Sequence, residues 1–251
     1  ISMKKSILIF IISHFASFRL LNLFKKIPFE ELKNYNLKIL ISDDSSRDDT
    51  WDIAKKIKEE NENIVLNYNK PNLGYGGNIK FCLNYASKNN FDYVAMLHGD
   101  GQYDPKYIVE MIKKIESNEK YHAVVGSRMI NKKDAILGKM PIYKFIGNIA
   151  LTKLSNLILK QRTTDCHSGY WTYKAKSLKK LKFINNTNGF NFDQQIRMQF
   201  ADQKMEIAEI PIKTFYGTEK SYFHLIYSSR FVFELIIYVL IKLKLYKSKR
   251  F

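Results

Sequence analysis

Short apolar runs alternate with amphipathic stretches through the first half of the chain. The apolar runs predict buried strands at residues 7–12, 37–42, 64–68, 93–97 and 123–126. Apolar residues at helical spacing between these runs predict helices at residues 48–60, 77–87 and 105–117. Strands that alternate with helices form βαβ units, so we predict an α/β fold with a mostly parallel central sheet flanked by helices.

The second half of the chain has fewer strand patterns. It predicts helices at residues 141–160 and 192–201 and short strands near 169–174 and 206–212. No internal repeat and no Gly/Ser-rich linker interrupts the chain, so we assign residues 4–221 to one domain. Residues 222–251 then form a C-terminal segment of a different character.

That C-terminal segment is predicted to be an amphipathic helix at a membrane surface. Its apolar run at residues 231–241 is interrupted by Glu234 and followed by several cations. A helix that spans a bilayer needs about 20 apolar residues, so this run is too short to cross. An apolar helix that ends in cations is typical of membrane interfaces. The alternatives are a helix packed on the core or on a second copy, and a longer, weakly hydrophobic span over residues 222–246.

The charge balance narrows the choice of partners. The 251 residues include 41 Lys and Arg against 24 Asp and Glu, a net charge of +17. Such a chain favours a polyanion: nucleic acid, a phosphorylated substrate or an anionic membrane. The alternative is that the positive charge serves only to keep the protein soluble. The lysines are spread along the chain without a recognisable nucleic-acid module, so we predict that nucleic acid is not the partner.

Cysteine usage and the N-terminal pattern indicate the compartment. Cys82 and Cys166 form no CxxC pair, which excludes a zinc ribbon or a disulfide framework. The apolar run at residues 7–12 is too short for a signal peptide. We therefore expect a cytoplasmic protein.

Two polar clusters follow predicted strands directly, at Asp43-Asp44-Ser45-Ser46 and at His98-Gly99-Asp100-Gly101-Gln102. In a parallel sheet, ligands bind beyond the carboxyl ends of the strands, so we expect both clusters to share one crevice. Asp43 is placed to accept the N–H of a uracil or guanine base. The oxygens of Asp100 and Gln102 suit Mg²⁺ or Mn²⁺ on a diphosphate, and the His98 imidazole would favour Mn²⁺. A plain Gly-containing turn is the alternative for the second cluster.

A Gly-rich turn at residues 72–80, NLGYGGNIK, leads into a predicted helix. Gly76 lies in this turn, which is similar to a phosphate cradle but lacks the P-loop Gly-Lys-Ser/Thr. Glycines that admit close packing at the start of a helix explain the turn equally well.

Taken together, the motifs resemble one family. ILISDDSSRDDT, NLGYGGNIK, HGDGQYDP, GSRM (126–129) and DCHSGYWTY (165–173) have the order and spacing of the family-two inverting glycosyltransferases. The chain is similar to their GT-A branch with polyprenyl- and dolichyl-phosphate sugar transferases, over residues 37–221, and to a bacterial subgroup with LHGDGQ. The resemblance implies a Rossmann-like GT-A fold and a metal-dependent hexosyltransferase of polysaccharide or glycolipid biosynthesis.

The resemblance also implies roles for individual residues. Asp43 would contact the base, Asp44 would lie near the nucleoside, and Ser13 and Gly76 would line the donor site. Asp100, with Gln102 and His98, would hold the metal on the diphosphate. Arg128 would meet the diphosphate or an acceptor phosphate. Asp165, His167 and Ser168 would line the sugar and acceptor pocket, supported by Asp193.

Three departures from the family pattern bear on activity. The first loop reads Ser13-His14-Phe15-Ala16-Ser17 and lacks the usual acidic residue. His98 replaces the first aspartate of the metal motif, and Trp171 replaces an arginine that would contact phosphate. A non-catalytic relative that only binds a nucleotide-sugar is therefore kept as an alternative.

The function implied is the inverting transfer of a hexose from a UDP- or GDP-sugar to a lipid phosphate, polyprenyl phosphate, at the inner face of the cell membrane. A phosphate acceptor is already anionic near neutral pH and needs no strong base. A hydroxyl of a lipid or surface glycan is the alternative acceptor. It would need a base, for which Asp165, His167 and Asp193 are the candidates. The sequence does not determine the base of the nucleotide-sugar, the identity of the sugar or the oligomeric state.

Overall fold

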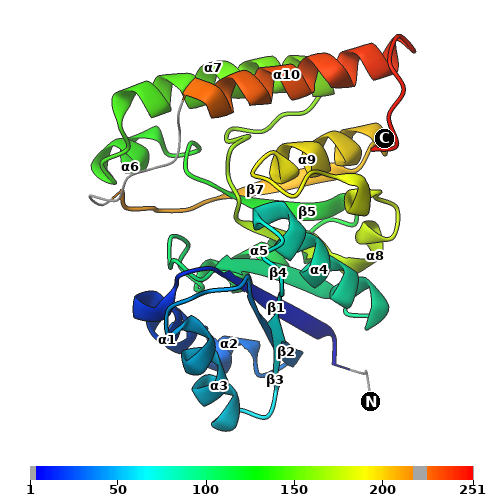
Figure 1. Ribbon diagram of the computed structural model, residues 1–251. Helices are drawn as coiled ribbons and strands as arrows, with labels where there is room; N and C mark the ends of the chain where they lie inside the picture. Colours follow the sequence, from blue (N-terminus) through cyan, green and yellow to red (C-terminus); the bar gives the residue numbers. More distant parts are fainter. Residues whose placement is uncertain (1–3, 217–224, 251) are drawn as a thin grey trace.

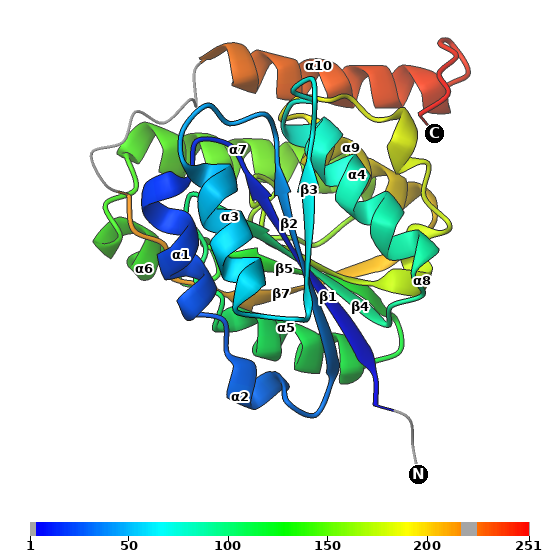
Figure 2. The same cartoon turned by 60° about the horizontal axis from the view of Figure 1, so that its bottom comes forward.

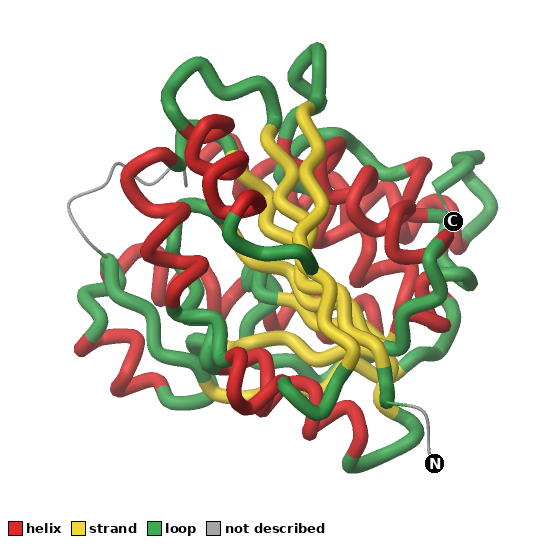
Figure 3. Tube along the Cα trace, turned by 90° about the horizontal axis from the view of Figure 1, so that it is seen from below, coloured by secondary structure: helices red, strands yellow, loops and turns green. Residues whose placement is uncertain are grey.

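The computed structural model describes residues 4–216 and 225–250, and a seven-stranded sheet runs through its middle (Figures 1 and 3). The strand order is β3-β2-β1-β4-β6-β5-β7. β6 pairs antiparallel with β4 and β5, and every other pairing is parallel. The strands are β1 (Ser6–Ser13), β2 (Asn36–Asp43), β3 (Ile64–Tyr68), β4 (Tyr93–His98), β5 (Tyr121–Ser127), β6 (Trp171–Lys174) and β7 (Glu206–Pro211).

The central strand β1 explains the layered build. Ile7, Ile9 and Ile11 point to one face of the sheet and Leu8 and Phe10 to the other, and all five are fully buried. A strand that is apolar on both sides needs helices on both faces. The predicted α/β class with a mostly parallel sheet is confirmed.

Helices cover the two faces (Figure 2). One core contains residues of α1 (Ser17–Lys25), α2 (Phe29–Leu32), α3 (Thr50–Glu59) and α5 (Tyr107–Glu116). The other contains residues of α4 (Tyr75–Lys88), α8 (Ala175–Leu178), the 3₁₀ turn Phe183–Asn185 and α9 (Phe192–Asp202).

A further layer lies beyond α9, where α7 (Ile142–Leu159) and α10 (Leu225–Lys242) run side by side, next to α6 (Lys132–Leu137) (Figure 1). Leu159, Phe231 and Leu235 are buried between these helices and α9. The predicted C-terminal helix is thus present. Among the described residues no helix is long and apolar enough to cross a bilayer. The predicted domain boundary at residues 221 and 222 lies outside the described residues.

Candidate functional site

Three neighbouring strands bring the predicted donor residues to one edge of the sheet. Ser13 at the end of β1 is in register with Asp43 at the end of β2, and Ile12 is in register with His98 at the end of β4. The Gly99 N–H donates to the Ile12 carbonyl oxygen at 2.8 Å, which keeps the following loop against β1. The two polar clusters therefore meet at one edge, as parallel strands require.

Asp43 offers one unused oxygen at this edge. Its side chain is buried, and its Oδ1 accepts hydrogen bonds from the Ser46 N–H (3.0 Å) and hydroxyl (2.6 Å). Its Oδ2 is buried and has no hydrogen-bond partner among the described residues. Burial raises the pKa of Asp43, and the Ser46 hydrogen bonds oppose this. A buried acceptor without a donor is costly, so a ligand N–H is the expected complement.

The first loop packs tightly on the Asp100 loop. A Cβ at Gly99 would lie 2.6 Å from the Ser13 Oγ and 3.1 Å from the Ala16 Cβ. Only glycine lets these loops approach so closely. The Ser13 hydroxyl is buried, with no partner among the described residues. Ser13 and Asp43 thus each have a buried side-chain oxygen without a hydrogen-bond partner among the described residues.

Asp44, predicted to lie near the nucleoside, is bound to the protein. Its Oδ1 accepts from the Leu73 N–H (2.8 Å) and the Asn69 amide (3.0 Å), and its Oδ2 accepts from the Gly74 N–H (2.9 Å). The carboxylate therefore holds the Gly-rich turn onto the end of β2. Its contact with a nucleoside stays a prediction.

Gly76, predicted to line the donor site, serves packing in this structure. Its N–H donates to the Asn188 carbonyl oxygen at 2.7 Å, so the start of α4 is already occupied by protein. A Cβ at Gly76 would lie 2.5 Å from the Thr187 carbonyl oxygen. Of the two explanations for the glycines, close packing is the one that the geometry supports, and the phosphate cradle is not supported.

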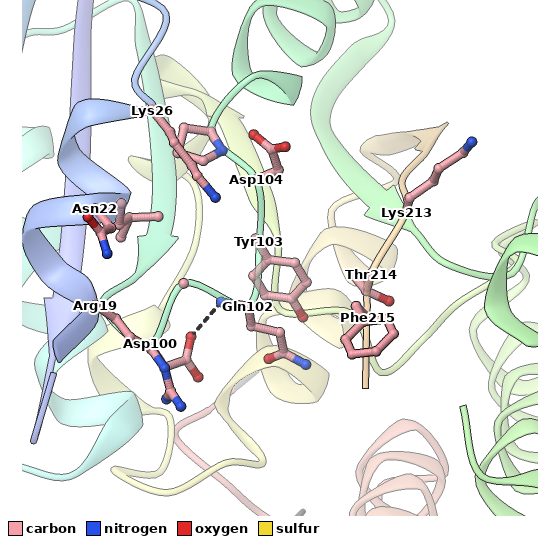
Figure 4. A pocket seen from close by; sticks show the side chains of 13 residues that line it. Arg19, Asn22, Lys26, Asp100, Gln102, Tyr103, Asp104, Lys213, Thr214 and Phe215 are labelled. Atoms are coloured by element: carbon pink, nitrogen blue, oxygen red, sulfur yellow. Dashed lines mark hydrogen bonds between the residues drawn. The ribbon is translucent and has the colours of Figure 1, made fainter. Parts of the chain in front are cut away.

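The Asp100 loop lines a cavity of about 320 Å³ between α1 and the segment after β7 (Figure 4). The Asp100 carboxylate is exposed, and its Oδ1 accepts from the Gln102 N–H at 2.9 Å. Arg19, Lys26 and Lys213 contribute cations to the lining. Asp43 is fully buried at the neighbouring strand end and does not line this cavity.

His98 does not join Asp100 as a second exposed ligand. Its side chain is half-buried, with Nε2 buried, and its ring meets the rings of Tyr75 and Tyr103 edge-on, at centroid distances of 5.7 and 5.0 Å. Burial lowers the pKa of His98, so the imidazole is neutral near pH 7. The packing of this ring against aromatic side chains does not support the prediction that His98 ligates a metal.

The described residues fit a cation that is held largely by its substrate. They contain no group of three His, Cys, Asp or Glu side chains that could hold a metal ion. Asp100 supplies an exposed carboxylate, with Gln102 two positions away. Mg²⁺ is commonly bound by one or two carboxylates together with substrate phosphates, so this single carboxylate suffices for a diphosphate-bound cation.

Arg128 and Asp165 form a second group between β5 and α7. The Arg128 Nε and Nη2 donate to the two Asp165 oxygens at 2.7 and 2.9 Å, and the Asn148 amide adds a third bond at 2.8 Å. Burial alone would raise the pKa of Asp165, but the charge and hydrogen bonds of Arg128 outweigh it and hold this pKa well below its usual range. Asp165 is consequently a poor proton acceptor, which argues against it as the base.

His167 and Ser168, predicted to line the sugar and acceptor pocket, are half-buried and fully buried respectively. The Ser168 hydroxyl donates to the Gly126 carbonyl oxygen at 2.5 Å and is fully buried. Burial lowers the pKa of His167 to about 4, and its ring packs on Phe231 of α10 at 4.5 Å. Ser168 thus joins its loop to β5, and His167 joins the same loop to α10. The contact of either residue with sugar or acceptor stays a prediction.

Asp193 has the properties expected of a base. Its Oδ2 accepts from the Tyr75 hydroxyl at 2.7 Å, and its Oδ1 is buried without a partner among the described residues. Burial raises its pKa to about 7, against the Tyr75 hydrogen bond, which lowers it. A Cβ at Gly169 would lie 3.4 Å from Asp193 and 3.1 Å from His98, so Asp193 adjoins both the 165–169 loop and the Asp100 strand end.

Two buried cations in this region, Lys144 near Arg128 and Arg197 beside Asp165, were not predicted. Lys144 of α7 is buried, with its Nζ 5.7 Å from the ring centre of Tyr216, whose hydroxyl accepts from Arg128. Arg197 of α9 is fully buried, and its Nη2 donates to the Asp165 carbonyl oxygen at 3.5 Å. Helical position alone predicts an exposed lysine, and only the absence of acids in 141–160 hinted otherwise.

Comparison with known proteins identifies the relatives of this chain. Residues 19–182 match the family model described as glycosyl transferase family 2. A UDP-N-acetylglucosamine–dolichyl-phosphate N-acetylglucosaminyltransferase of Methanococcus voltae is 30% identical over 198 residues, covering 74% of this chain and 78% of the relative. A poly-β-1,6-N-acetyl-D-glucosamine synthase of Staphylococcus aureus is 31% identical over 146 residues, 58% of this chain and 34% of that one.

Solved structures share the fold at low identity. A glucosyl-3-phosphoglycerate synthase from Mycobacterium tuberculosis, in complex with Mn²⁺, UDP and glucosyl-3-phosphoglycerate, has a TM-score of 0.61 at 11% identity, covering 94% of this chain and 79% of that one. A Pyrobaculum calidifontis mannosyltransferase in complex with GDP-mannose and Mn²⁺ has a TM-score of 0.59 at 10% identity, covering 98% and 66%. The central sheet and its helices are thus those of GT-A glycosyltransferases.

Proposed function

The chain belongs to glycosyl transferase family 2, and we propose that it transfers a hexose, with inversion, from a UDP- or GDP-sugar to a lipid phosphate such as polyprenyl phosphate. The relative named as a dolichyl-phosphate transferase supports this acceptor class. The reaction takes place at the inner face of the cell membrane, where the lipid phosphate is available.

The observation that carries the acceptor assignment is a surplus of positive charge beside Arg128. Arg128 pairs with the Asp165 carboxylate and donates to the Tyr216 hydroxyl, and Lys144 lies near the Tyr216 ring with no carboxylate partner among the described residues. Burial, together with the Arg128 charge, lowers the pKa of Lys144, so the group gains from an anionic partner. A phosphate monoester supplies that anion and is itself the nucleophile, with a second pKa of about 6.

In a direct displacement at the anomeric carbon, different residues of the chain would bind the nucleoside, position the acceptor and neutralise the departing diphosphate. The spare oxygens of Asp43 and Ser13 bind and orient the nucleoside at the strand ends. Arg128 and Lys144 position the acceptor phosphate for attack on the anomeric carbon. When bound at Asp100 and Gln102, a divalent cation would neutralise the charge that develops on the departing diphosphate. Arg19, Lys26 and Lys213 add positive charge around the same loop.

Asp193 favours a second candidate acceptor, a hydroxyl of a lipid or glycan. A hydroxyl must lose its proton during attack, and a buried carboxylate with a pKa of about 7 is suited to accept it. The similarity to a poly-N-acetylglucosamine synthase agrees with this alternative. A non-catalytic relative would bind the donor without transferring its sugar.

An acceptor panel tests the proposal. Purified protein is given labelled UDP- and GDP-sugars with polyprenyl phosphate or with a hydroxyl acceptor, in detergent, with Mg²⁺, Mn²⁺ or EDTA. We expect a lipid-linked product with inverted anomeric configuration by NMR, and no product with EDTA or with Asp100→Asn.

Lys144→Met separates the two acceptors. We expect it to raise KM for the lipid phosphate by about tenfold, the loss of one charged hydrogen bond. Lys113→Met, on the exposed face of α5, is the matched control and should leave KM unchanged. Transfer to hydroxyls alone would contradict the lipid-phosphate proposal.

A further inference from the structure

In helix α7 the polar side faces the protein and the apolar side faces outward, the opposite of an ordinary surface helix. Its buried side is mainly polar, with Lys144, Asn148, Thr152 and Ser155 directed inward. Its exposed side is mainly apolar, and the exposed residues recur at helical spacing: Ile142, Ile146, Ala150, Leu154 and Leu157. A helix on a water-facing surface has the opposite arrangement. The outward stripe therefore fits an apolar environment.

The inward polar side has a structural reason. The Asn148 amide donates to Asp165 at 2.8 Å, the Cys166 N–H donates to the Thr152 hydroxyl at 3.1 Å, and the Asn156 amide donates to the Thr163 carbonyl oxygen at 2.7 Å. These contacts hold the segment that carries Asp165. They account for the polar residues inside, whereas no contact among the described residues accounts for the apolar residues outside.

The helices beside α7 continue the apolar surface. Ile136 and Leu137 of α6 are 57% and 77% exposed, and Phe233 and Ile236 of α10 are 60% and 50% exposed. α10 is fixed against α7 and α9 by its other side, through Phe231, Leu235 and Tyr238. α7 and α10 lie side by side at one end of the molecule (Figure 1).

Positive charges predominate around this surface. Residues 130–160 contain one acid, Asp134, and six lysines, of which all but Lys144 are exposed: Lys132, Lys133, Lys139, Lys144, Lys153 and Lys160. Beyond α10 the exposed Lys244, Lys247 and Lys249 follow. Glu234 of α10 is buried and paired with Arg250, so it does not offset these cations. Apolar side chains bordered by lysines are complementary to the headgroups and acyl chains of an anionic leaflet.

We propose that the outward sides of α6, α7 and α10 together form a docking face for an anionic lipid bilayer, with α7 lying in the plane of the interface. This inference deepens the proposed function and rests on it for its biological purpose. It extends the predicted membrane contact from the C-terminal segment to α7, which also holds Asp165. The docking face thereby places the Arg128–Lys144 cluster next to the lipid surface.

Vesicle sedimentation tests the docking face without any sugar transfer. The full chain is mixed with vesicles of phosphatidylcholine alone or with phosphatidylglycerol added, in the absence of nucleotide-sugar. We expect binding to the mixed vesicles and weaker binding to the neutral ones. The double variant Ile146→Gln/Leu157→Gln should bind the mixed vesicles at least about tenfold more weakly, because it removes two of the apolar side chains whose burial drives binding.

Phe18→Gln is the matched control, because Phe18 is 95% exposed on α1 and lies outside the docking face. It should bind vesicles like the unsubstituted protein. Circular dichroism must show the same helix content for all variants, and glutamine is chosen because it favours helices.

Equal binding of the double variant and the unsubstituted protein would overturn the docking face. So would a stable dimer, in analytical ultracentrifugation, that the double variant dissociates, since a second copy would then cover these side chains. Vesicle binding without sugar transfer to polyprenyl phosphate would leave the docking face standing and refute the proposed function. Transfer in detergent without vesicle binding would do the reverse.

Discussion

Arg128 grips both carboxylate oxygens of Asp165, at 2.7 and 2.9 Å, in a position where the carboxylate is fully buried. A buried pair of this kind depends on both partners, because removing one leaves an uncompensated charge away from water.

Asp165→Asn should therefore destabilise the fold by about 3–5 kcal/mol. The measurement is urea unfolding at neutral pH. Asp52→Asn is the control, since Asp52 pairs with Lys55 on the surface and such pairs contribute about 0–1 kcal/mol. Similar losses for the two variants would show that the buried pair is not a stabilising element.

Gly76→Ala should reduce stability rather than only donor affinity. The added Cβ would lie 2.5 Å from the Thr187 carbonyl oxygen, so backbone must move, at a cost of about 1–3 kcal/mol. Gly147→Ala in α7 is the control, because no atom lies within 4 Å of its Cβ position. That change should stabilise slightly, as alanine favours helices. Unchanged thermal unfolding of Gly76→Ala, with weakened donor binding, would restore the phosphate-cradle hypothesis.

Asp43→Asn should weaken nucleotide binding by about tenfold or more. The substitution places an N–H donor where a base N–H requires an acceptor, and a charged hydrogen bond contributes about 1.5–3 kcal/mol. Isothermal calorimetry with UDP and GDP measures the loss, and the nucleotide that binds identifies the donor. Asp49→Asn, exposed in the same loop, should bind normally. If both variants bind like the parent, the spare Asp43 oxygen has another purpose.

Asp193 should make stability fall as pH rises. Its pKa of about 7 in the folded protein lies above the ordinary value of 3.8, so between these values the folded state binds the extra proton. Stability from this group is therefore full below about pH 4 and is lost progressively up to about pH 7. Asp193→Asn should flatten the unfolding free energy over this window, as measured by urea titrations at several pH values. A variant as pH-dependent as the parent would show that Asp193 is ionised throughout.

The strands of the sheet could be predicted almost completely from the sequence, whereas the outer helices were predicted less well. The alternation in SILIFIIS is apolar on both sides, which leaves a central parallel strand as the simple solution, and β1 is that strand. Helix α1 was not predicted, because its buried residues Leu20, Leu23 and Phe24 are too few to stand out in sequence. For α7 the period predicted a helix correctly, but a period does not tell which side faces inward.

The site shows the same division. The strand-end position of Asp43 and Asp100 follows from counting strands, so it could be predicted. The N–H groups of Leu73 and Gly74 donate to the Asp44 carboxylate, and the N–H at the start of α4 donates to the Asn188 carbonyl oxygen. These contacts join loops that are far apart in the sequence, so they could not be predicted from it. Trp171 illustrates the limit: the sequence shows that an arginine is missing at this position, but not that the fully buried guanidinium of Arg197 lies 4.9 Å from the Trp171 ring centre.

The bond from Asn148 to Asp165 has a mechanical consequence. One side of α7 is hydrogen-bonded to the loop that carries Asp165, while the opposite side carries exposed apolar side chains. A rigid rod cannot tilt on one side only, so any rocking of α7 against its surroundings is transmitted to the Asp165 carboxylate. The orientation of α7 and the position of the Arg128 guanidinium, which Asp165 binds, are thereby coupled.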